Sequence, residues 1–262
     1  MIRGLYTSGW GMMALTRNMD VVSNNMANVD TNAFKRDITV NESFPHLLTQ
    51  RLNDVKPNAA TRAIGRMSLG FDVGEVFTDY TQGQLVNTDR RLDLAIRSSR
   101  PDSGTAFFTV EAMDREGNTA IYYTRDGAFR LDAQNRLVTS EGYPVLGENG
   151  YIILNGDNFS VDPDGIIIQD GVAVDRLRIT EFQNVALLSK AGSNLIAAGE
   201  QAEPQPFTGE VVQGFLEKAN VNIIKEMISM MTIMRAYEAN QKALIAQDET
   251  LGKAVNELGA LG

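Results

Sequence analysis

Residues 12–29 read MMALTRNMDVVSNNMANV, and the spacing of the apolar residues in this stretch indicates how the chain is organised. Six apolar positions are separated alternately by three and four residues, as in the heptad seam of helices that pack side by side. They are Met12, Leu15, Met19, Val22, Met26 and Val29. Gly9 and Gly11 precede this seam and Asp30-Thr31-Asn32 follows it. We therefore predict a helix over residues 11–29.

The C-terminal end of the chain repeats the same spacing over a longer stretch. Steps of four and three continue through eleven positions, of which only Gln241 and Asp248 are polar: Ile223, Met227, Met230, Met234, Tyr237, Gln241, Leu244, Asp248, Leu251, Val255 and Leu258. A helix over residues 222–258 is about 55 Å long at 1.5 Å per residue. The plain interpretation is a pair of core helices in a bundle. Narrow seams at opposite termini favour instead two helices that pack on each other in a coiled-coil arrangement and on further copies of the chain.

The middle of the chain has the two-residue period of β-strands. Asp-Gly, Asn-Gly and Glu-Gly turn signals recur about every ten residues, and no helical stretch interrupts them. Strands are expected at 106–113, 121–124, 128–131, 136–139, 144–146, 151–154, 159–161, 166–168, 176–182 and 194–197. This pattern predicts an α+β protein with long terminal helices around a central all-β domain of the sandwich or barrel-like type.

The changes of period divide the chain into five segments. An N-terminal helical assembly domain covers residues 1–36 and packs with its C-terminal counterpart at 222–262. The β domain covers 71–198. Proline-containing linkers, at 37–70 and 199–221, connect it to the two helices.

Composition excludes several classes of protein. The 262 residues are 43% hydrophobic and carry a net charge of −9, which argues against binding to nucleic acid or to an anionic membrane. Cysteine is absent and His46 is the single histidine, so thiolate chemistry and histidine metal clusters are excluded. Residues 1–36 carry +2 and residues 215–262 carry −1, so the acidity lies in the middle. Neither a cleaved secretory peptide nor a membrane-spanning run is expected.

The acidic residues do not form a recognisable reactive motif. Asp157, Asp162 and Asp164 lack the closing glutamate of a calcium-binding loop, so an Asp-Gly turn is the preferred interpretation. Asp126 and Asp132 could supply a carboxylate pair for glycoside hydrolysis, although each adjoins a turn or the polar face of a strand. We predict no catalytic residues, no metal site, no cofactor and no enzymatic activity.

Four segments together resemble a known family. They are residues 19–36, MDVVSNNMANVDTNAFKR; residues 82–96, with Gly83, Thr88, Asp93 and Ala95; residues 123–129, YTRDGAF; and residues 215–242, with Asn220-Val221-Asn222 and Arg235-Ala236-Tyr237-Glu238. The chain is similar here to the bacterial flagellar rod and hook protein family. The resemblance implies a structural subunit that is exported through the flagellar export apparatus without a cleaved signal peptide. It also implies helical assembly in the periplasm-spanning rod of the basal body, with copies of itself and other axial proteins as partners.

The resemblance also implies which residues make assembly contacts. Asn24, Asn25 and Asn28 match the N-terminal motif, with amides suited to bridging neighbouring backbones. Asn220 and Asn222 match the entry of the C-terminal helix, where an amide can cap free N–H groups. Arg235, Tyr237 and Glu238 match its middle, and the first and last of these could pair across subunits.

The chain departs from the family pattern at two places. Ala33 stands where glycine is usual, so we expect Asn32 to take the positive φ of the bend. Residues 98–104, SSRPDSG, replace the usual glycines before Phe107-Phe108.

Three interpretations follow. A rod subunit in the proximal position is favoured, with the distal rod as the alternative; it predicts protease-sensitive ends and a resistant core near 71–198. A cell-wall glycan-binding or hydrolytic β domain with coiled-coil ends would depend on Asp126 and Asp132. A coiled-coil adhesin would require a secretion signal.

Overall fold

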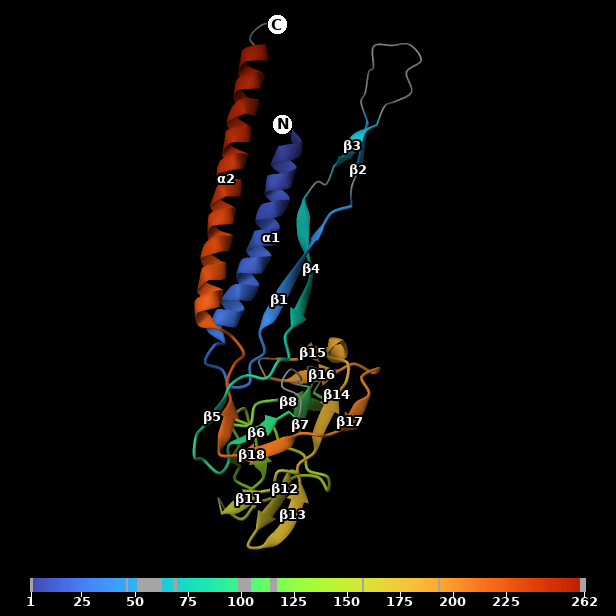
Figure 1. Cartoon of the computed structure of the whole chain (residues 1–262), viewed down its shortest axis with the longest axis vertical. Helices are drawn as coiled ribbons and strands as arrows, with labels where there is room; N and C mark the ends of the chain where they lie inside the picture. Colours follow the sequence, from blue (N-terminus) through green and yellow to red (C-terminus); the bar gives the residue numbers. More distant parts are fainter. Residues whose placement is uncertain are drawn as a thin grey trace. The chain divides into compact units, whose positions relative to one another are not determined.

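The chain folds into two compact units. The computed structural model describes all residues except 1, 46, 51–62, 68–69, 99–104, 114–116, 157, 193 and 260–262. The first compact unit, here called the terminal unit, consists of Met1–Met26, Asp37–Phe77 and Ile223–Gly262. The second, the β unit, consists of Ala27–Arg36 and Thr78–Asn222. Figure 1 shows the elements of both.

Two long helices dominate the terminal unit. Helix α1 covers Ile2–Ala27 and helix α2 covers Ile223–Gly259, so the predicted C-terminal helix is confirmed to within one residue at each end. Helix α1 begins nine residues before the predicted start, because Gly9 and Gly11 are internal to it. Gly11 is buried, and a Cβ at this position would lie 3.8 Å from the Asn240 amide nitrogen of α2. Gly11 therefore lies inside the helix and faces α2 with room for a methyl group; it does not start the helix.

Residues 37–77 belong to the same unit as the helices, whereas the sequence suggested a linker at 37–70. Strand β1 (Asp37–Ser43) pairs with β4 (Phe71–Thr78), and β2 (Leu47–Gln50) pairs with β3 (Ala63–Met67). The Trp10 ring of α1 packs edge-on against Phe44 at a centroid distance of 5.3 Å. Arg17 of α1 forms an ion pair with Asp72 of β4 at 2.9 Å. Strands β1 and β4 thus pack along α1.

The β unit is built from antiparallel strand pairs, as the turn spacing predicted. Its largest sheet has the order β15-β16-β8-β7-β14-β17. These strands are β7 (Ala106–Met113), β8 (Thr119–Thr124), β14 (Ile179–Phe182), β15 (Leu188–Lys190), β16 (Ile196–Ala198) and β17 (Pro204–Pro206), with the short 3-10 helix η1 (Val185–Leu187) before β15.

Smaller sheets complete the β unit. A three-stranded sheet has the order β11-β12-β13, and three strand pairs join β9 with β10, β6 with β18 and β5 with β19. Their bounds are β5 (Leu85–Asn87), β6 (Leu94–Arg97), β9 (Arg130–Leu131), β10 (Leu137–Val138), β11 (Phe159–Val161), β12 (Ile166–Gln169), β13 (Val172–Arg176), β18 (Glu210–Gln213) and β19 (Phe215–Glu217). Residues 199–221, predicted as a return linker, therefore contribute three strands to this unit.

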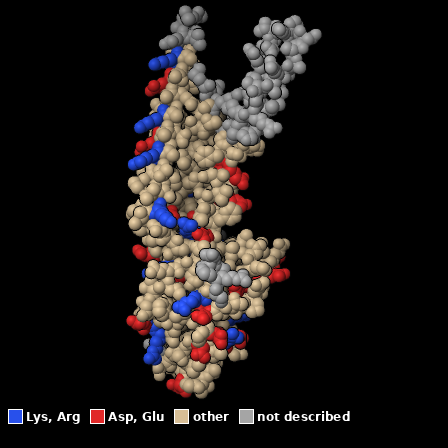
Figure 2. All heavy atoms as spheres, viewed as in Figure 1, with Lys and Arg blue, Asp and Glu red and all other residues tan. Residues whose placement is uncertain are grey.

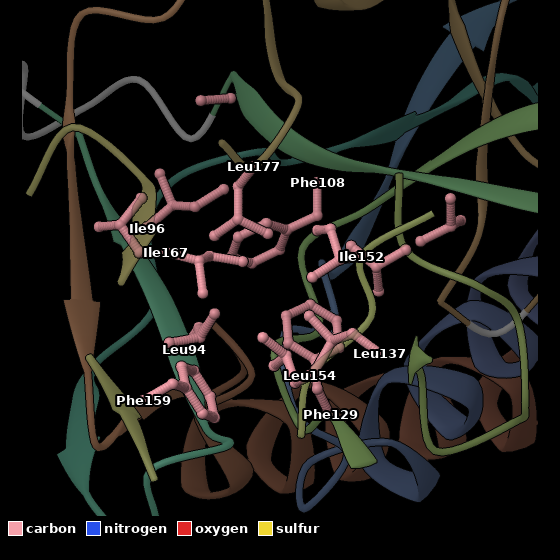
Figure 3. Packing of buried hydrophobic residues seen from close by; sticks show 14 of the residues in the cluster. Leu94, Ile96, Phe108, Phe129, Leu137, Ile152, Leu154, Phe159, Ile167 and Leu177 are labelled. Carbon is pink, nitrogen blue, oxygen red and sulfur yellow. The ribbon is translucent and has the colours of Figure 1, made fainter. Parts of the chain in front are cut away.

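Strand β7 lies at the centre of the hydrophobic core. Phe108 and Val110 belong to the main cluster shown in Figure 3, together with Phe129, Leu154 and Ile167 from neighbouring segments. Phe107, on the opposite face of the strand, packs in a second cluster with Tyr80 and Phe182. Because successive side chains of a strand point to opposite faces, β7 is covered on both sides.

The predicted Asp-Gly turn at residues 164–165 is confirmed, whereas the predicted positive φ of Asn32 is wrong. The Asp162–Gly165 turn joins β11 to β12: the Gly165 N–H donates to the Asp162 carbonyl at 2.8 Å, and Gly165 has φ of 80°. The bend after α1 corrects the sequence analysis, because Ala33 has the positive φ, at 57°, and Asn32 does not. The Ala33 N–H donates to the Glu217 carbonyl at 2.8 Å, and this long-range contact holds the alanine in the left-handed region.

Candidate assembly interface

Helix α1 buries a row of mostly small and polar residues. Ser8, Gly11, Leu15, Asn18 and Asn25 follow the heptad spacing and are buried. Leu15 belongs to the predicted seam, but the other four lie beside it. The seam methionines Met12, Met19 and Met26, together with Val22 and Val29, are only half-buried. The interior of the terminal unit is therefore more polar along α1 than the apolar seam suggested.

In helix α2, as in α1, part of the row of least exposed side chains lies one residue before the predicted seam. Its least exposed side chains recur at steps of four and three: Glu226, Met230, Ile233, Tyr237, Asn240, Leu244, Gln247 and Leu251. Met230, Tyr237, Leu244 and Leu251 are shared with the predicted seam. The remaining seam positions, Ile223, Met227, Met234, Gln241, Asp248 and Val255, are exposed. The side chain of Leu258 lies outside the described residues.

Small residues of α1 meet amide side chains of α2 in an antiparallel arrangement. A Cβ at Gly4 would lie 2.6 Å from the Gln247 amide nitrogen, and one at Gly11 would lie 3.8 Å from that of Asn240. The two pairs are one heptad apart on each helix, and the residue numbers run in opposite directions. Figure 1 shows the helices side by side in this way. Within one chain, glycines of α1 and amide side chains of α2 thus lie between the two helices.

The first third of α2 carries an exposed apolar face. Ile224 is 66% exposed, and Met227, Ile228, Met231 and Met234 are each about half exposed, at 48–54%. These five residues recur at steps of three, one, three and three, so they lie on one side of the helix. We call them the α2 apolar face. Isolated exposed apolar residues are ordinary on protein surfaces, but a contiguous group of this kind is typical of an interaction site.

Charged residues continue the same side of α2 toward its C-terminus. Arg235, Glu238 and Lys242 are exposed and follow the apolar face at helical spacing. In Figure 2 a row of basic and acidic side chains marks one edge of α2, whereas most of the visible surface of α1 and α2 is neither. Arg235 and Glu238, predicted to pair across subunits, are therefore accessible at the surface of the monomer.

Asn25 and Asn220 bind backbone within the chain. The Asn25 amide nitrogen donates to the Asp37 carbonyl at 2.8 Å, and its oxygen accepts from the Asp37 N–H at 2.9 Å. Asn220 accepts from the Arg36 N–H at 2.8 Å and donates to the Asp79 carbonyl at 2.7 Å. Asn220 thus connects the segment after α1 to the segment before α2, where the sequence suggested a helix cap. Asn24 and Asn222 are exposed, and Asn28 is half-buried and accepts from the Thr31 hydroxyl at 3.3 Å.

A buried ionic cluster in the β unit was not foreseen from the sequence. Glu217 accepts from Lys35 Nζ at 2.6 Å through one carboxylate oxygen and from Arg125 Nε at 2.7 Å through the other. The three side chains are 3%, 1% and 1% exposed, for Lys35, Arg125 and Glu217 respectively. The available signal was that each of the three charged residues lies in a segment that resembles the family: Lys35 in 19–36, Arg125 in 123–129 and Glu217 in 215–242.

The cluster shifts the pKa of two of its members. Burial is the largest influence on Lys35 and lowers its pKa, because the interior disfavours the charged amine; the opposing charge of Glu217 does not fully offset this. Burial raises the pKa of Glu217, but the charges of Arg125 and Lys35 together outweigh it, so the pKa lies below its ordinary value. Glu217 is therefore a carboxylate held between two cations.

Asp126 and Asp132, the carboxylates of the glycan hypothesis, are both engaged by backbone N–H groups. Asp126 is buried and accepts from the Ala128 N–H at 3.0 Å, and burial raises its pKa. Asp132 accepts from the N–H groups of Gln134 and Arg136 at 2.9 and 2.8 Å. Burial raises the pKa of Asp132, but the hydrogen bonds from Arg136 outweigh it. Both carboxylates thus stabilise turns. Asp157 and loop residues 99–104 lie outside the described part of the chain.

Known family models match three stretches of the chain, which include most of both helices and part of the β unit. The Flagella basal body rod protein model matches residues 5–35, the Flagellar hook protein FlgE/F/G D1 domain model matches 103–180, and the Flagellar basal body rod FlgEFG protein C-terminal model matches 212–257. These matches define a class of protein, that of the flagellar hook and basal-body rod.

Full-length relatives narrow the class. The flagellar basal-body rod protein FlgG of Buchnera aphidicola (subspecies Acyrthosiphon pisum) is 37% identical over 270 residues, covering 97% of this chain and 98% of the relative. FlgG of Bacillus subtilis is 33% identical over 277 residues, covering 98% and 99%. FlgF of Caulobacter vibrioides is 32% identical over 266 residues and covers both chains completely. The chain belongs to the flagellar basal-body rod protein family.

Proposed function

We propose that the chain is a structural subunit of the basal-body rod that assembles through α1 and α2 into a helical tube. The tube surrounds the export channel and transmits torque. The observation that carries this proposal is the α2 apolar face, which is left exposed while the helix pair encloses amides and small residues. A single chain in water would be more stable with its apolar side chains between the helices and its amides at the surface. Packing of α2 against other subunits buries the apolar face and supplies the missing partner.

The predicted seam supports the same assignment. Its exposed members on α2, together with the half-buried methionines of α1, form rows that neighbouring helices can cover in a coiled-coil arrangement. Methionine adapts to surfaces of different shape, which suits contacts with both identical and related axial subunits. The partners proposed are copies of this chain, other rod and hook proteins, and the flagellar export apparatus. The role is structural and non-enzymatic.

A substitution in the α2 apolar face tests the assembly proposal. Ile228→Glu places a charge in the middle of this face and is expected to abolish polymerisation of the purified full-length chain. The charge would be desolvated in the assembled tube. Sedimentation velocity and negative-stain microscopy at increasing protein concentration measure the polymer, and circular dichroism checks that helix content is unchanged.

Val172→Glu is the matched control, because Val172 is an exposed apolar residue of β13 in the β unit and lies outside both assembly helices. It is expected to polymerise like the parent chain. If Ile228→Glu polymerises normally, the α2 apolar face is not the assembly surface.

The axial position along the rod is a separate proposal. Residues 142–150, GYPVLGENG, look more like the corresponding segment of a proximal rod subunit, so we favour the proximal rod, with the distal rod as the alternative. The relatives carry both the FlgG and the FlgF names. A cryo-electron microscopy map of isolated basal bodies with a tag on this subunit distinguishes the two, and density at the end remote from the inner membrane would refute the proximal assignment.

A further inference from the structure

Three charged side chains from distant segments meet inside the β unit. Lys35, in the segment that follows α1, precedes Glu217 by 182 positions, and Arg125 precedes it by 92. Glu217 lies on β19, five residues before the β unit ends at Asn222. The carboxylate that the two cations share therefore comes from the last strand of the unit, whereas both cations come from earlier parts of the chain.

Among the described residues, Glu217 is the carboxylate within ion-pair distance of both cations, and Asp79 acts on Lys35 more weakly. The other acceptors of Arg125 are the backbone carbonyls of Ala106 and Ile96, and the other acceptor of Lys35 is the Thr81 carbonyl at 2.7 Å. These carbonyls satisfy N–H groups but carry no net charge. A buried ion pair that loses one partner leaves an uncompensated charge, which is strongly destabilising. Docking of Lys35 beside Arg125 is therefore unfavourable until Glu217 is in place, because the two cations repel each other.

Backbone contacts join the same two segments. The Ala33 N–H donates to the Glu217 carbonyl, and the Arg36 N–H donates to the Asn220 side chain at 2.8 Å. Strand β19 itself pairs with β5, and the Lys218 N–H donates to the Gln84 carbonyl at 2.9 Å. Residues 33–36 thus rest on a strand that is itself paired within the β unit.

We propose that the two ion pairs of Glu217, with Lys35 and with Arg125, act as an electrostatic clasp. Because of this clasp, residues 33–36 dock on the rest of the β unit only together with β19. The segment that leaves α1 and the segment that enters α2 are then anchored in one step. A chain that emerges N-terminus first keeps its N-terminal arm unanchored until its last β-strand arrives. This dependence concerns folding of the β unit, and it holds whether or not the chain polymerises.

A double-mutant cycle in the full-length chain tests the clasp. Lys35→Met is expected to destabilise the parent protein, because it removes a partner of Glu217. In a Glu217→Gln background the same substitution is expected to stabilise, because it removes a cation that lacks its counter-charge. The unfolding equilibrium constant should change about tenfold in opposite directions in the two backgrounds. Equal effects of the same sign would refute the clasp.

Glu210→Gln is the matched control, because Glu210 lies on the adjacent strand β18 and its ion pair with Arg97 is exposed. It is expected to leave the unfolding constant within about twofold of the parent value, as for other surface ion pairs.

Refolding of the parent chain provides a test that needs no variant. Pulse-labelling hydrogen exchange follows the Ala33 amide, which is bonded to β19, and the Lys218 amide, which is bonded to Gln84. The two amides are expected to become protected in the same kinetic phase. Protection at residues 33–36 in an earlier phase than at β19 would contradict the proposal, even if Glu217→Gln proved unable to fold.

Discussion

At the scale of single residues, Ala33 shows how a local conformation is imposed from outside. Its φ of 57° lies in the left-handed region, which is unfavourable for any residue with a Cβ by about 1 kcal/mol or more. Ala33 is 7% exposed and its N–H is held by the Glu217 carbonyl. The hydrogen bond and the burial of the neighbouring Phe34 and Lys35 stabilise a conformation that the local sequence does not favour.

Ala33→Gly is therefore expected to stabilise the β unit by about 0.5–1 kcal/mol, because glycine adopts this conformation without the steric penalty. The free energy of unfolding in urea measures the change. Ala120→Gly, in the extended strand β8, serves as the control and is expected to destabilise by a similar amount. A loss of stability with Ala33→Gly would show that the alanine methyl group contributes more by packing than it costs in strain.

Two buried carboxylates give the β unit opposite responses to acid. The pKa of Glu217 is below its ordinary 4.5 in the folded state, so the stability it contributes is complete above 4.5 and is lost as the pH falls toward the folded pKa. The pKa of Asp126 is raised from 3.8 by burial, so its protonation favours the folded state as the pH falls through the folded value. Asp126→Asn removes the stabilisation that comes from protonation of Asp126 and leaves the effect of Glu217 in place.

We therefore expect Asp126→Asn to lose stability more steeply than the parent chain as the pH falls through the raised folded pKa of Asp126 toward 3.8, the ordinary value of this carboxyl. Urea unfolding at a series of pH values from neutrality downward measures the two slopes. Parallel curves for the two proteins would show that Asp126 titrates alike in the folded and unfolded states.

At the scale of elements, close backbone approach decides where glycine is required. The backbone forms no regular turn at Asp126-Gly127, where the sequence predicted one, and the tightest constraint on Gly127 comes from β6. The Leu94 N–H donates to the Gly127 carbonyl at 3.0 Å, and a Cβ on Gly127 would lie 1.6 Å from the Leu94 carbonyl oxygen. A backbone atom cannot move aside as the end of a flexible side chain can, so β6 itself would have to shift.

Gly127→Ala is expected to destabilise the β unit by about 3 kcal/mol or more, the upper range for overpacked interiors. Gly192→Ala is the control, because a Cβ there meets nothing within 4 Å. Thermal unfolding followed by circular dichroism compares the two variants with the parent. Similar melting temperatures for all three would mean that β6 moves away without loss of stability.

At the scale of the whole molecule, the chain crosses between the two units at residues 26–27, 36–37, 77–78 and 222–223. The segment 27–36 is therefore part of the β unit, although it follows α1 directly. The sequence pattern places this segment in the N-terminal helical domain and predicts a protease-resistant core near residues 71–198. Strands β17, β18 and β19 and the ionic cluster extend the packed region well beyond these limits.

Limited proteolysis of the monomer is expected to remove α1 and α2 and to leave a resistant β unit that retains residues 33–36 and 215–220. Helices with exposed apolar faces and no partner subunits open more readily than the packed strands. Mass spectrometry of the fragments identifies the boundaries, and polymerised protein is the control, because its helices are expected to be protected. Cleavage between residues 36 and 71 with release of 33–36 would contradict the extended boundary.

The sequence by itself determined the two long helices, the positions of strands β7 to β12, β14 and β16, and the family. Heptad steps predicted two helices, a period of two predicted the β region, and Asp-Gly turns predicted several of its connections, because these are local properties of the chain. Tertiary structure alone decided the rest. It selected which side of each helix is buried, brought residues 37–77 to the helices, placed the strain on Ala33 and assembled Lys35, Arg125 and Glu217. Those features depend on contacts between residues as far as 182 positions apart, for which a local pattern carries no signal.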